Sequence, residues 1–414
     1  MPEQRRPVVA IVDSYTCSDF LLTAFHALEV DAVQVRSDPG LPSFSPSMKY
    51  LATVTGADTA ALADELAQHS PIAVVAGMEP DVPLADALSE RLGLHSNGTA
   101  LSSARRNKYD MAETLRRAGV RCAEQFKSDR AADIVAWAQA AGRYPVVVKP
   151  LSSAATDGVA ICADVEQVRE AAEAVLGTET LWGEANDEVL IQSYLDGVEY
   201  VVDMVSWQGS RYTCGVWEYH KRLVGVHNLY DYEIALPPED GRVAELIDYV
   251  DSALTALGIG YGPTHAEVII TADGPTLVEV GARTAGNLYP AFSDECLGVN
   301  QAHLAALAYS RPREFLDSYA GRRYPLLRQA CVYNAVVDLD GVVRRVNADV
   351  VAEIEAMDTV FELSLKYKEG ARIRPTFDLL SSPLKIFLRA DSLEDVMRDY
   401  ARIEVLKDRL FELD

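Results

Sequence analysis

Paired cysteines, long apolar runs and basic charge are all scarce in this chain. The six cysteines, at positions 17, 122, 162, 214, 296 and 331, show no Cys-x-x-Cys spacing, so we expect no disulfide framework and a reduced, cytoplasmic protein. No apolar stretch is long enough to span a bilayer, and MPEQRRPVVAIVDS is expected to form a strand rather than a signal peptide. Lys and Arg number 38 against 62 Asp and Glu, which argues against nucleic acids and acidic membranes as partners.

Several cofactor motifs are missing as well. The first expected strand is not followed by G-x-G-x-x-G, so dinucleotide binding is unsupported, and no G-x-x-x-x-G-K-[ST] phosphate loop occurs. His265-Ala266-Glu267 matches the H-x-E of zinc deaminases, but their P-C-x-x-C partner is missing, which argues against zinc. Cys17 follows the first expected strand without a histidine near it in sequence, so we expect no nucleophilic role for it.

Length and composition predict a globular protein of two or three domains. The chain has 414 residues, 49% of them hydrophobic. Strands and helices alternate from residue 7 to about 95, which is typical of a parallel sheet covered by helices. The stretch CVYNAVVDLDGVVRRV suggests a hairpin around Asp340 and Gly341. The expected strands include 7–12, 32–35 and 72–76, and the expected helices 19–28, 59–69, 82–92, 100–118, 130–141, 164–176, 239–257 and 392–411.

Two glutamates form the most informative pattern in the chain. Glu267 and Glu279 each end a short β-branched run, and Gly274 with Pro275 lies between the runs, which predicts a hairpin with one carboxylate on each strand. Facing carboxylates are costly unless cations hold them, and Mg²⁺ prefers such oxygen ligands together with substrate phosphates. Arg283 follows closely enough to act on the same reacting group. A buried structural Glu–Arg pair is an equally good interpretation of these residues alone.

Two further segments carry polar residues at the ends of apolar runs. In YPVVVKPLSSAATDGVAIC, the expected strand 146–148 ends at Lys149 and is followed by small residues, which let backbone N–H groups approach phosphate oxygens, although a plain turn explains them too. In EVLIQSYLDGVEYVVDMVSW, the run 189–191 leads into a turn at Asp196-Gly197 with Glu199 after it. The strand edge can pair with an adenine ring and the glutamate with ribose hydroxyls; an ordinary hairpin is the alternative.

The order of these elements resembles the ATP-grasp superfamily over roughly residues 100 to 310. EVGARTAG and GVHNLYDYEIALP look more narrowly like the L-amino acid ligase group, which joins amino acids into dipeptides. The resemblance implies an α/β protein with three parts. These are an N-terminal parallel α/β domain (1–100), an ATP-grasp domain (101–328) with an α+β lid at about 120–207, and a C-terminal α+β domain (329–414).

The resemblance also implies roles for individual residues. Glu267 and Glu279 match the Mg²⁺ ligands, and Arg283 matches the arginine at the acyl-phosphate centre. Two departures from the family pattern stand out: Gly281 occupies a place where many members have Asn, so one metal would rely more on phosphate and water, and Gln192 replaces a frequent Glu. The positions that match ATP-binding residues are Lys108 on the helix entering the fold, Lys149 at the phosphates, Ser152, Ser153, Thr156 and Gly158 in the covering loop, Gln192, Ser193 and Leu195 at the adenine, and Glu199 at the ribose.

The implied activity is an ATP- and Mg²⁺-dependent ligation of an amino acid to a second amino acid or an amine through an acyl phosphate, with ADP and phosphate as products. Other acid–amine ligation, carboxylase-like chemistry and a non-catalytic ATP sensor are the alternatives. Many relatives pair through their flanking domains, so a homodimer is compatible with the resemblance.

Other residues near the implied site are ambiguous from sequence. His227 lies in a Gly- and Tyr-rich segment and is a candidate contact for the bound amino acid or the transferring phosphate; a loop histidine is more often a packing or surface residue. Lys221 is equally a phosphate contact or a solvated strand-end lysine. Trp217, Tyr230 and Tyr232 suggest aromatic pocket walls, although core packing explains them as well.

Overall fold

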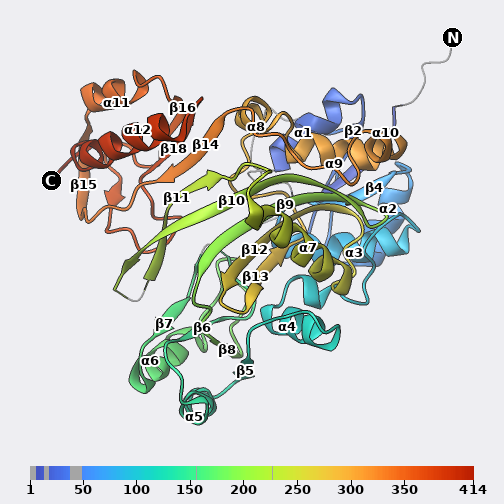
Figure 1. The fold of residues 1–414 in the computed structure, drawn as a ribbon. Coiled ribbons are helices and arrows are strands. Elements are labelled where there is room, and N and C mark those ends of the chain that lie inside the picture. Colours follow the sequence, from blue (N-terminus) through green and yellow to red (C-terminus); the bar gives the residue numbers. More distant parts are fainter. Residues whose placement is uncertain (1–5, 14–17, 38–48, 155, 226) are drawn as a thin grey trace.

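The computed structural model describes residues 6–13, 18–37, 49–154, 156–225 and 227–414 (Figure 1). Its strands form four sheets. No helix in the described part of the chain is long and apolar enough to cross a membrane.

The N-terminal sheet is parallel, with the strand order β3-β2-β1-β4. Alternate residues of β1 explain why helices cover both faces: Val9 and Ile11 pack with α1, whereas Val8, Ala10 and Val12 pack with α2 and α3. The predicted alternation is confirmed, although the sequence analysis missed β3. The elements are β1 (Val8–Val12), α1 (Ser18–Ala27), β2 (Asp31–Arg36), β3 (Ala52–Thr55), α2 (Thr59–Ala67), β4 (Ala73–Ala76), η1 (Glu79–Asp81) and α3 (Val82–Arg91).

A short helical segment leads into the next sheet. The helix expected over 100–118 is a 3₁₀ turn, η2 (Ser103–Arg105), followed by α4 (Lys108–Arg117). The α-helix begins only at Lys108 because the Asn107 side chain accepts hydrogen bonds from the backbone N–H groups of Tyr109 and Asp110. Its end fits Gly119, whose φ of 73° suits glycine.

The lid sheet is antiparallel, with the order β5-β8-β6-β7. Ile134 and Val135 of one helix and Val168 and Ala172 of another cover its apolar face. The elements are β5 (Gln125–Ser128), α5 (Ala131–Ala141), β6 (Val146–Pro150), β7 (Ala160–Cys162), α6 (Val165–Val175) and β8 (Val189–Ser193).

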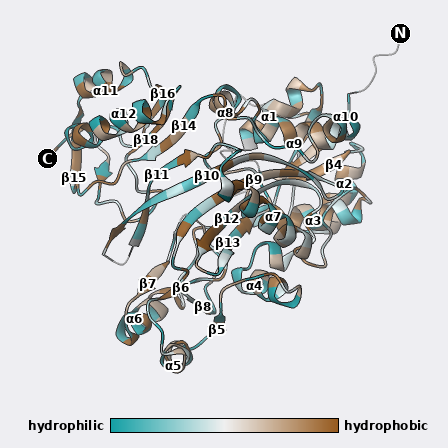
Figure 2. Ribbon diagram, in the orientation of Figure 1, coloured by the Kyte–Doolittle hydropathy of each residue, from teal (hydrophilic) through white to brown (hydrophobic). Residues whose placement is uncertain are grey.

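The largest sheet runs through the centre of the molecule in the order β13-β12-β9-β10-β11-β14-β18-β16. Its strands β12 and β13 are coloured hydrophobic along much of their length, whereas α4 at the surface is largely hydrophilic (Figure 2). The sheet and its helices consist of β9 (Val198–Trp207), β10 (Ser210–Val224), β11 (His227–Ala235), α7 (Gly241–Ala256), β12 (Gly262–Thr271), β13 (Gly274–Gly281), α8 (Pro290–Leu297), α9 (Gln301–Ser310), α10 (Pro312–Ser318), β14 (Gln329–Asn334), β16 (Val360–Leu365) and β18 (Leu384–Ala390).

The C-terminal part corrects one prediction. The hairpin expected around Asp340 and Gly341 is wrong, because β14 already pairs with β11 on one edge and β18 on the other. The next strand therefore joins a separate small sheet, ordered β17-β15-β19. The remaining elements are β15 (Gly341–Val346), α11 (Ala348–Glu355), β17 (Arg372–Ile373), α12 (Leu393–Leu406), η3 (Lys407–Arg409) and β19 (Phe411–Leu413).

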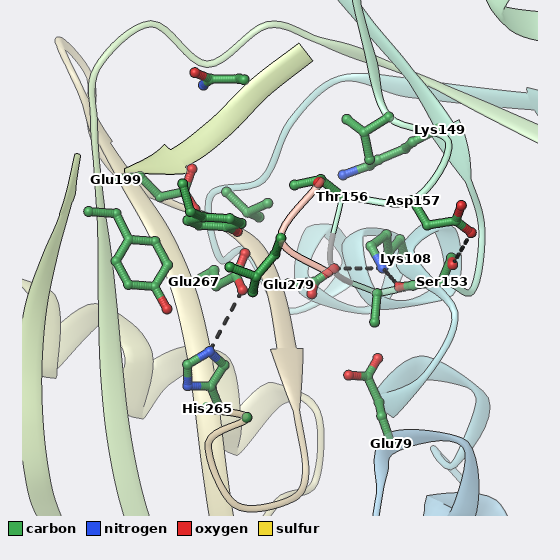
Figure 3. Close-up of a pocket in the computed structure, with 18 of the residues that line it drawn as sticks. Glu79, Lys108, Lys149, Ser153, Thr156, Asp157, Glu199, His265, Glu267 and Glu279 are labelled. Carbon is green, nitrogen blue, oxygen red and sulfur yellow. Dashed lines mark hydrogen bonds and ion pairs between the residues drawn. The ribbon is translucent and has the colours of Figure 1, made fainter. Parts of the chain in front are cut away.

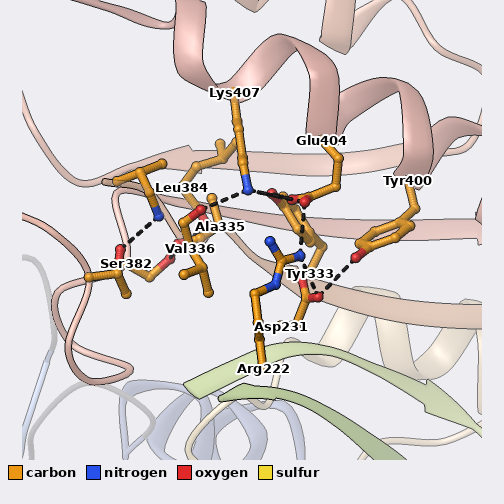
Figure 4. A network of polar contacts seen from close by, with 12 residues as sticks. Arg222, Asp231, Tyr333, Ala335, Val336, Ser382, Leu384, Tyr400, Glu404 and Lys407 are labelled. Carbon is orange, nitrogen blue, oxygen red and sulfur yellow. Dashed lines mark hydrogen bonds and ion pairs between the residues drawn. The ribbon is translucent and has the colours of Figure 1, made fainter. Parts of the chain in front are cut away.

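A network of ion pairs and hydrogen bonds connects α12 to the β10–β11 hairpin (Figure 4). The Arg222 guanidinium lies 2.7 Å from the Asp231 carboxylate and 2.9 Å from that of Glu404. Tyr400 donates to Asp231 at 2.9 Å, and Lys407 pairs with Glu404 at 2.9 Å. The contacts connect the C-terminal helix to both strands of the hairpin.

Candidate active site

A cavity of about 390 Å³ opens between the lid sheet, the large sheet and the end of β4 (Figure 3). Most of the residues selected from the sequence line it together, although they come from distant parts of the chain. They are Lys108, Lys149, Ser153, Thr156, Gln192, Ser193, Leu195, Glu199, Glu267, Glu279 and Arg283.

The two glutamates lie opposite each other, as the hairpin pattern predicted. Glu267 on β12 and Glu279 on β13 are register partners, so their side chains share one face of the sheet, and both line the cavity. The Lys108 ammonium lies 2.6 Å from the Glu279 carboxylate and donates to the carbonyl of Ser153 at 2.8 Å. Burial opposes the charge of Lys108, but Glu279 and Glu79 outweigh it and raise the pKa of Lys108.

His265 joins Glu267 to a second buried carboxylate. Its Nδ1 lies 2.7 Å from Asp203 and its Nε2 lies 3.7 Å from Glu267. Burial alone would lower the pKa of His265, but Asp203 raises it to about 10, so the imidazole is charged at neutral pH. Burial opposes ionisation of Glu267 too, yet His265 lowers the pKa of that glutamate and keeps it a carboxylate. The histidine of the H-x-E pattern thus orients and balances the neighbouring glutamate.

The glutamate pair fits a magnesium ion only in part. Both side chains are oxygen donors at the cavity wall, which is what Mg²⁺ requires. Among the described residues no three His, Cys, Asp or Glu side chains converge as a complete metal site. Glu267 and Glu279 therefore suit an ion that also takes phosphate oxygens and water.

Lys149 enters the cavity from the end of β6 and is only 5% exposed. Burial, together with the positive charge of Lys108, lowers the pKa of Lys149 to about 8. A polyanionic ligand would counteract both effects, because its negative charge favours the ammonium form.

The small-residue loop after Lys149 is only partly exposed to the cavity. Ser153 and Thr156 line it, and the Ser153 hydroxyl donates to Asp157 at 2.7 Å. Ser152 does not line the cavity; its carbonyl accepts from Arg106 at 3.2 Å. Gly158, with a φ of 66°, packs against Pro150, where an added Cβ would lie 2.9 Å from the ring. Ser152 and Gly158 therefore support the loop on the side away from the cavity.

The segment from Gln192 to Glu199 crosses from the lid sheet to the large sheet. Ser193 ends β8 and Val198 begins β9, so the turn is a hinge between two sheets and not an ordinary hairpin. Burial raises the pKa of Glu199, while Lys221 lies 2.6 Å from its carboxylate and favours the charged form. The other carboxylate oxygen of Glu199 is buried without a hydrogen-bond partner among the described residues. That oxygen is suited to accept from a ligand hydroxyl.

Arg283 approaches the cavity together with a residue that the sequence analysis missed. Its guanidinium lies 3.0 Å from the carboxylate of Glu79, which follows β4 in the N-terminal sheet. The position after the carboxyl end of a parallel strand is a usual place for ligand contacts and was the available signal for Glu79.

Polar residues from the C-terminal strands were also missed. Glu233 opposes Val332 on β14, and Asn334 opposes Lys385 on β18, so Glu233, Asn334 and Lys385 share one sheet face and line the cavity. Asn287 donates a hydrogen bond to Glu233. Burial raises the pKa of Glu233 to about 7, against the opposing influence of Lys385.

The remaining candidates have mixed outcomes. Tyr230 lines the cavity, whereas Tyr232 packs with the C-terminal core and Trp217 belongs to the core beneath the large sheet, so the alternative of core packing holds for two of the three aromatic residues. His227 begins β11 opposite Val224, and its side chain, like Cys17, lies outside the described residues.

Comparison with known proteins identifies the family to which this fold and this cavity belong. Residues 142–291 match the model of the ATP-grasp domain family. Dapdiamide A synthase from Enterobacter agglomerans is 32% identical over 422 residues, which cover 99% of this chain and 97% of the relative. The chain belongs to the ATP-grasp family and is a ligase of the kind that forms carbon–nitrogen bonds.

Solved structures share the fold along the whole chain. An L-amino acid ligase from Bacillus licheniformis superposes with a TM-score of 0.77 at 21% identity, covering 99% of this chain and all of that one. A carboxyaminoimidazole ribonucleotide synthase from Aspergillus clavatus, complexed with ATP, gives a TM-score of 0.71 at 15% identity and covers 98% and 99% of the two chains. These likenesses establish the architecture, and the predicted ATP-grasp fold is confirmed.

Proposed function

We propose that the protein joins an amino acid to a second amino acid or an amine through an acyl phosphate, and that ATP, Mg²⁺ and the cavity residues above carry the reaction. The observation that carries the proposal is the facing pair Glu267 and Glu279 with Lys108, Lys149 and Arg283 around one cavity. The names of two whole-length relatives, Dapdiamide A synthase and L-amino acid ligase, support amide formation.

In the first step, a carboxylate oxygen of the acid substrate attacks the γ-phosphorus of ATP and the bond to the β-phosphate oxygen breaks. A magnesium ion, when bound, supplies charge neutralisation on the phosphates. Lys108 and Lys149 place two positive charges at the same wall, and Glu199, one oxygen of which has no hydrogen-bond partner among the described residues, suits the ribose. The protein therefore acts mainly by positioning and electrostatic stabilisation, as in other phosphoryl transfers.

In the second step, the amine nitrogen attacks the acyl carbon and phosphate leaves. Arg283 is placed to stabilise the oxyanion that develops. Burial raises the pKa of Glu233 to about 7 and this side chain lines the same cavity, so Glu233 suits the proton released by the amine.

Isotope transfer from the acid to phosphate tests the proposed chemistry. An acid substrate labelled with ¹⁸O in its carboxylate should yield phosphate that carries one ¹⁸O, together with ADP and an amide of the expected mass. ADP release without label in the phosphate would contradict the acyl phosphate. No ADP release with any acid and amine pair would instead favour an ATP sensor.

Lys385 is expected to recognise the carboxylate of an amino acid that supplies the amine. Lys385→Gln should raise the KM of such a substrate about 10- to 100-fold, since a charge-assisted hydrogen bond contributes about 1.5–3 kcal/mol. When the same amino acid is supplied as its C-terminal amide, its KM should change less than about two-fold in this variant, because the amide offers Lys385 no negative charge. Steady-state kinetics with both substrates measures the difference.

The matched control is Lys366→Gln, because Lys366 is exposed and lies outside the cavity. It should leave both KM values unchanged. An equal rise for acid and amide in the Lys385 variant would show that Lys385 does not read the carboxylate.

Nucleotide binding is expected to take up protons at alkaline pH. The pKa of Lys149 is about 8 in the free protein, and nucleotide phosphates should raise it. At about pH 9 most free protein has neutral Lys149, so binding should take up close to one proton; below about pH 7 Lys149 is already charged and no uptake is expected. Titration calorimetry in buffers of different ionisation enthalpy measures the number. Equal uptake by wild type and Lys149→Met would assign the proton elsewhere.

A further inference from the structure

Four charged side chains form a continuous chain from the reacting end of the cavity to the lid. The Arg283 guanidinium lies 3.0 Å from one carboxylate oxygen of Glu79, and the other oxygen lies 3.5 Å from Arg106. Arg106 in turn lies 3.1 Å from the carboxylate of Glu184. The order Arg283–Glu79–Arg106–Glu184 links segments that are far apart in the sequence.

The series of ion pairs is buried at its centre, at Glu79 and Arg106, and exposed at its outer end, at Glu184. The side chains of Glu79 and Arg106 are 6% and 7% exposed, whereas that of Glu184 is 50% exposed. Arg106 also donates to the carbonyl of Ser152 in the loop that follows Lys149. A single guanidinium therefore contacts the N-terminal part, the phosphate-covering loop and the lid, and these three acceptors together stabilise its buried charge.

Glu184 belongs to an ordered loop of the lid between α6 and β8, which we term the lid loop (residues 177–186). Backbone hydrogen bonds close its base, from Gly177 to the carbonyl of Asn186 at 3.1 Å and from Thr180 to that of Glu184 at 2.8 Å. The tip residues Leu181 and Trp182 line the cavity. The pair between Arg106 and Glu184 therefore holds the loop beside its tip, whose residues line the cavity.

We propose that Arg106 and Glu184 are positioning residues that hold the lid loop over the acyl phosphate and so keep water from it. The inference rests on the proposed function for its chemical consequence. Arg106 acts inward as well, because it holds the carboxylate of Glu79 that orients Arg283.

Opening of the lid loop would allow water to hydrolyse the acyl phosphate in place of amide formation. With the loop in place, the amine nitrogen attacks the acyl carbon, the carbon–oxygen bond breaks and phosphate leaves with an amide formed. With the loop displaced, a water oxygen attacks the same carbon, which returns the free carboxylate and phosphate. ATP is then consumed without amide, so the ratio of ADP to amide reports the position of the loop.

Glu184→Gln tests the Arg106–Glu184 pair, which we term the latch, and leaves the buried pair of Glu79 and Arg106 in place. It should raise the ADP-to-amide ratio about two- to five-fold, the range accessible to a partly exposed ion pair. Unfolding of part of the sample would lower ADP and amide alike and leave the ratio unchanged. Glu179→Gln is the matched control, because Glu179 is exposed on the same loop and forms no ion pair with any described residue.

Hydrogen exchange of the free protein supplies a second measurement that needs no turnover. Amides of residues 177–186 should exchange faster in Glu184→Gln than in wild type or Glu179→Gln. A higher ratio and faster exchange confined to the Glu184 variant would support the latch. Unchanged exchange, or equal changes in both variants, would overturn it even if ligation is confirmed. Faster exchange without any amide formation by wild type would retain the latch and reject the proposed function.

Discussion

Replacing Glu279 with glutamine is expected to reduce ADP formation by about 10²- to 10³-fold. The substitution keeps the size of the side chain but removes one of two facing negative charges, and metal-assisted charge stabilisation is worth several kcal/mol at about 1.4 kcal/mol per factor of ten. Lys108 loses its ion pair with Glu279 in the same step, so the position of its ammonium is held less strongly. ADP release in the presence of amino acids measures the effect.

The matched control for this variant is Glu245→Gln, because Glu245 is exposed on α7 away from the cavity. It should keep wild-type ADP formation, and both variants should show the circular dichroism of the folded protein. Near-normal ADP output from folded Glu279→Gln would refute the metal-binding role of Glu279.

The parts of the site that the sequence predicted are those made by local pairing. Glu267 and Glu279 lie on strands joined by a tight turn, so the spacing of two β-branched runs is enough to predict that they face each other. Lys149 at the end of β6 is similar, since a buried run that ends in lysine and small residues is visible in one segment.

The parts that were missed depend on contacts between distant segments. Asn334 and Lys385 reach the cavity only because β14 pairs with β11 on one side and β18 on the other, and a one-residue shift would turn both side chains to the opposite face. The same pairing made the predicted hairpin at Asp340 wrong. A single sequence contains local periodicity but no signal for the register between strands that are about 50 to 100 residues apart.

Arg283→Met is expected to lower the rate of amide formation by about 10²- to 10³-fold while reducing ADP formation less. Arg283 lines the cavity and its position is fixed by Glu79, so its donors are oriented before the oxyanion develops. Removing one such donor typically costs about 3–4 kcal/mol. The first chemical step depends chiefly on Lys108, Lys149 and the glutamate pair, so ADP should still form and the acyl phosphate should be lost to water. Rapid-quench measurement of ADP and amide in the same reaction separates the two steps.

Removing this arginine also leaves the buried carboxylate of Glu79 with Arg106 as its ion-pair partner among the described residues, which lowers stability. Arg283→Lys controls for that loss, because it retains a positive charge near Glu79 but not the forked donor. We expect it to fold as wild type does and to recover only part of the amide rate, since one ammonium does not reproduce guanidinium geometry. Equal losses of ADP and amide formation in folded Arg283→Met would place Arg283 in phosphoryl transfer and contradict its assignment to the tetrahedral intermediate.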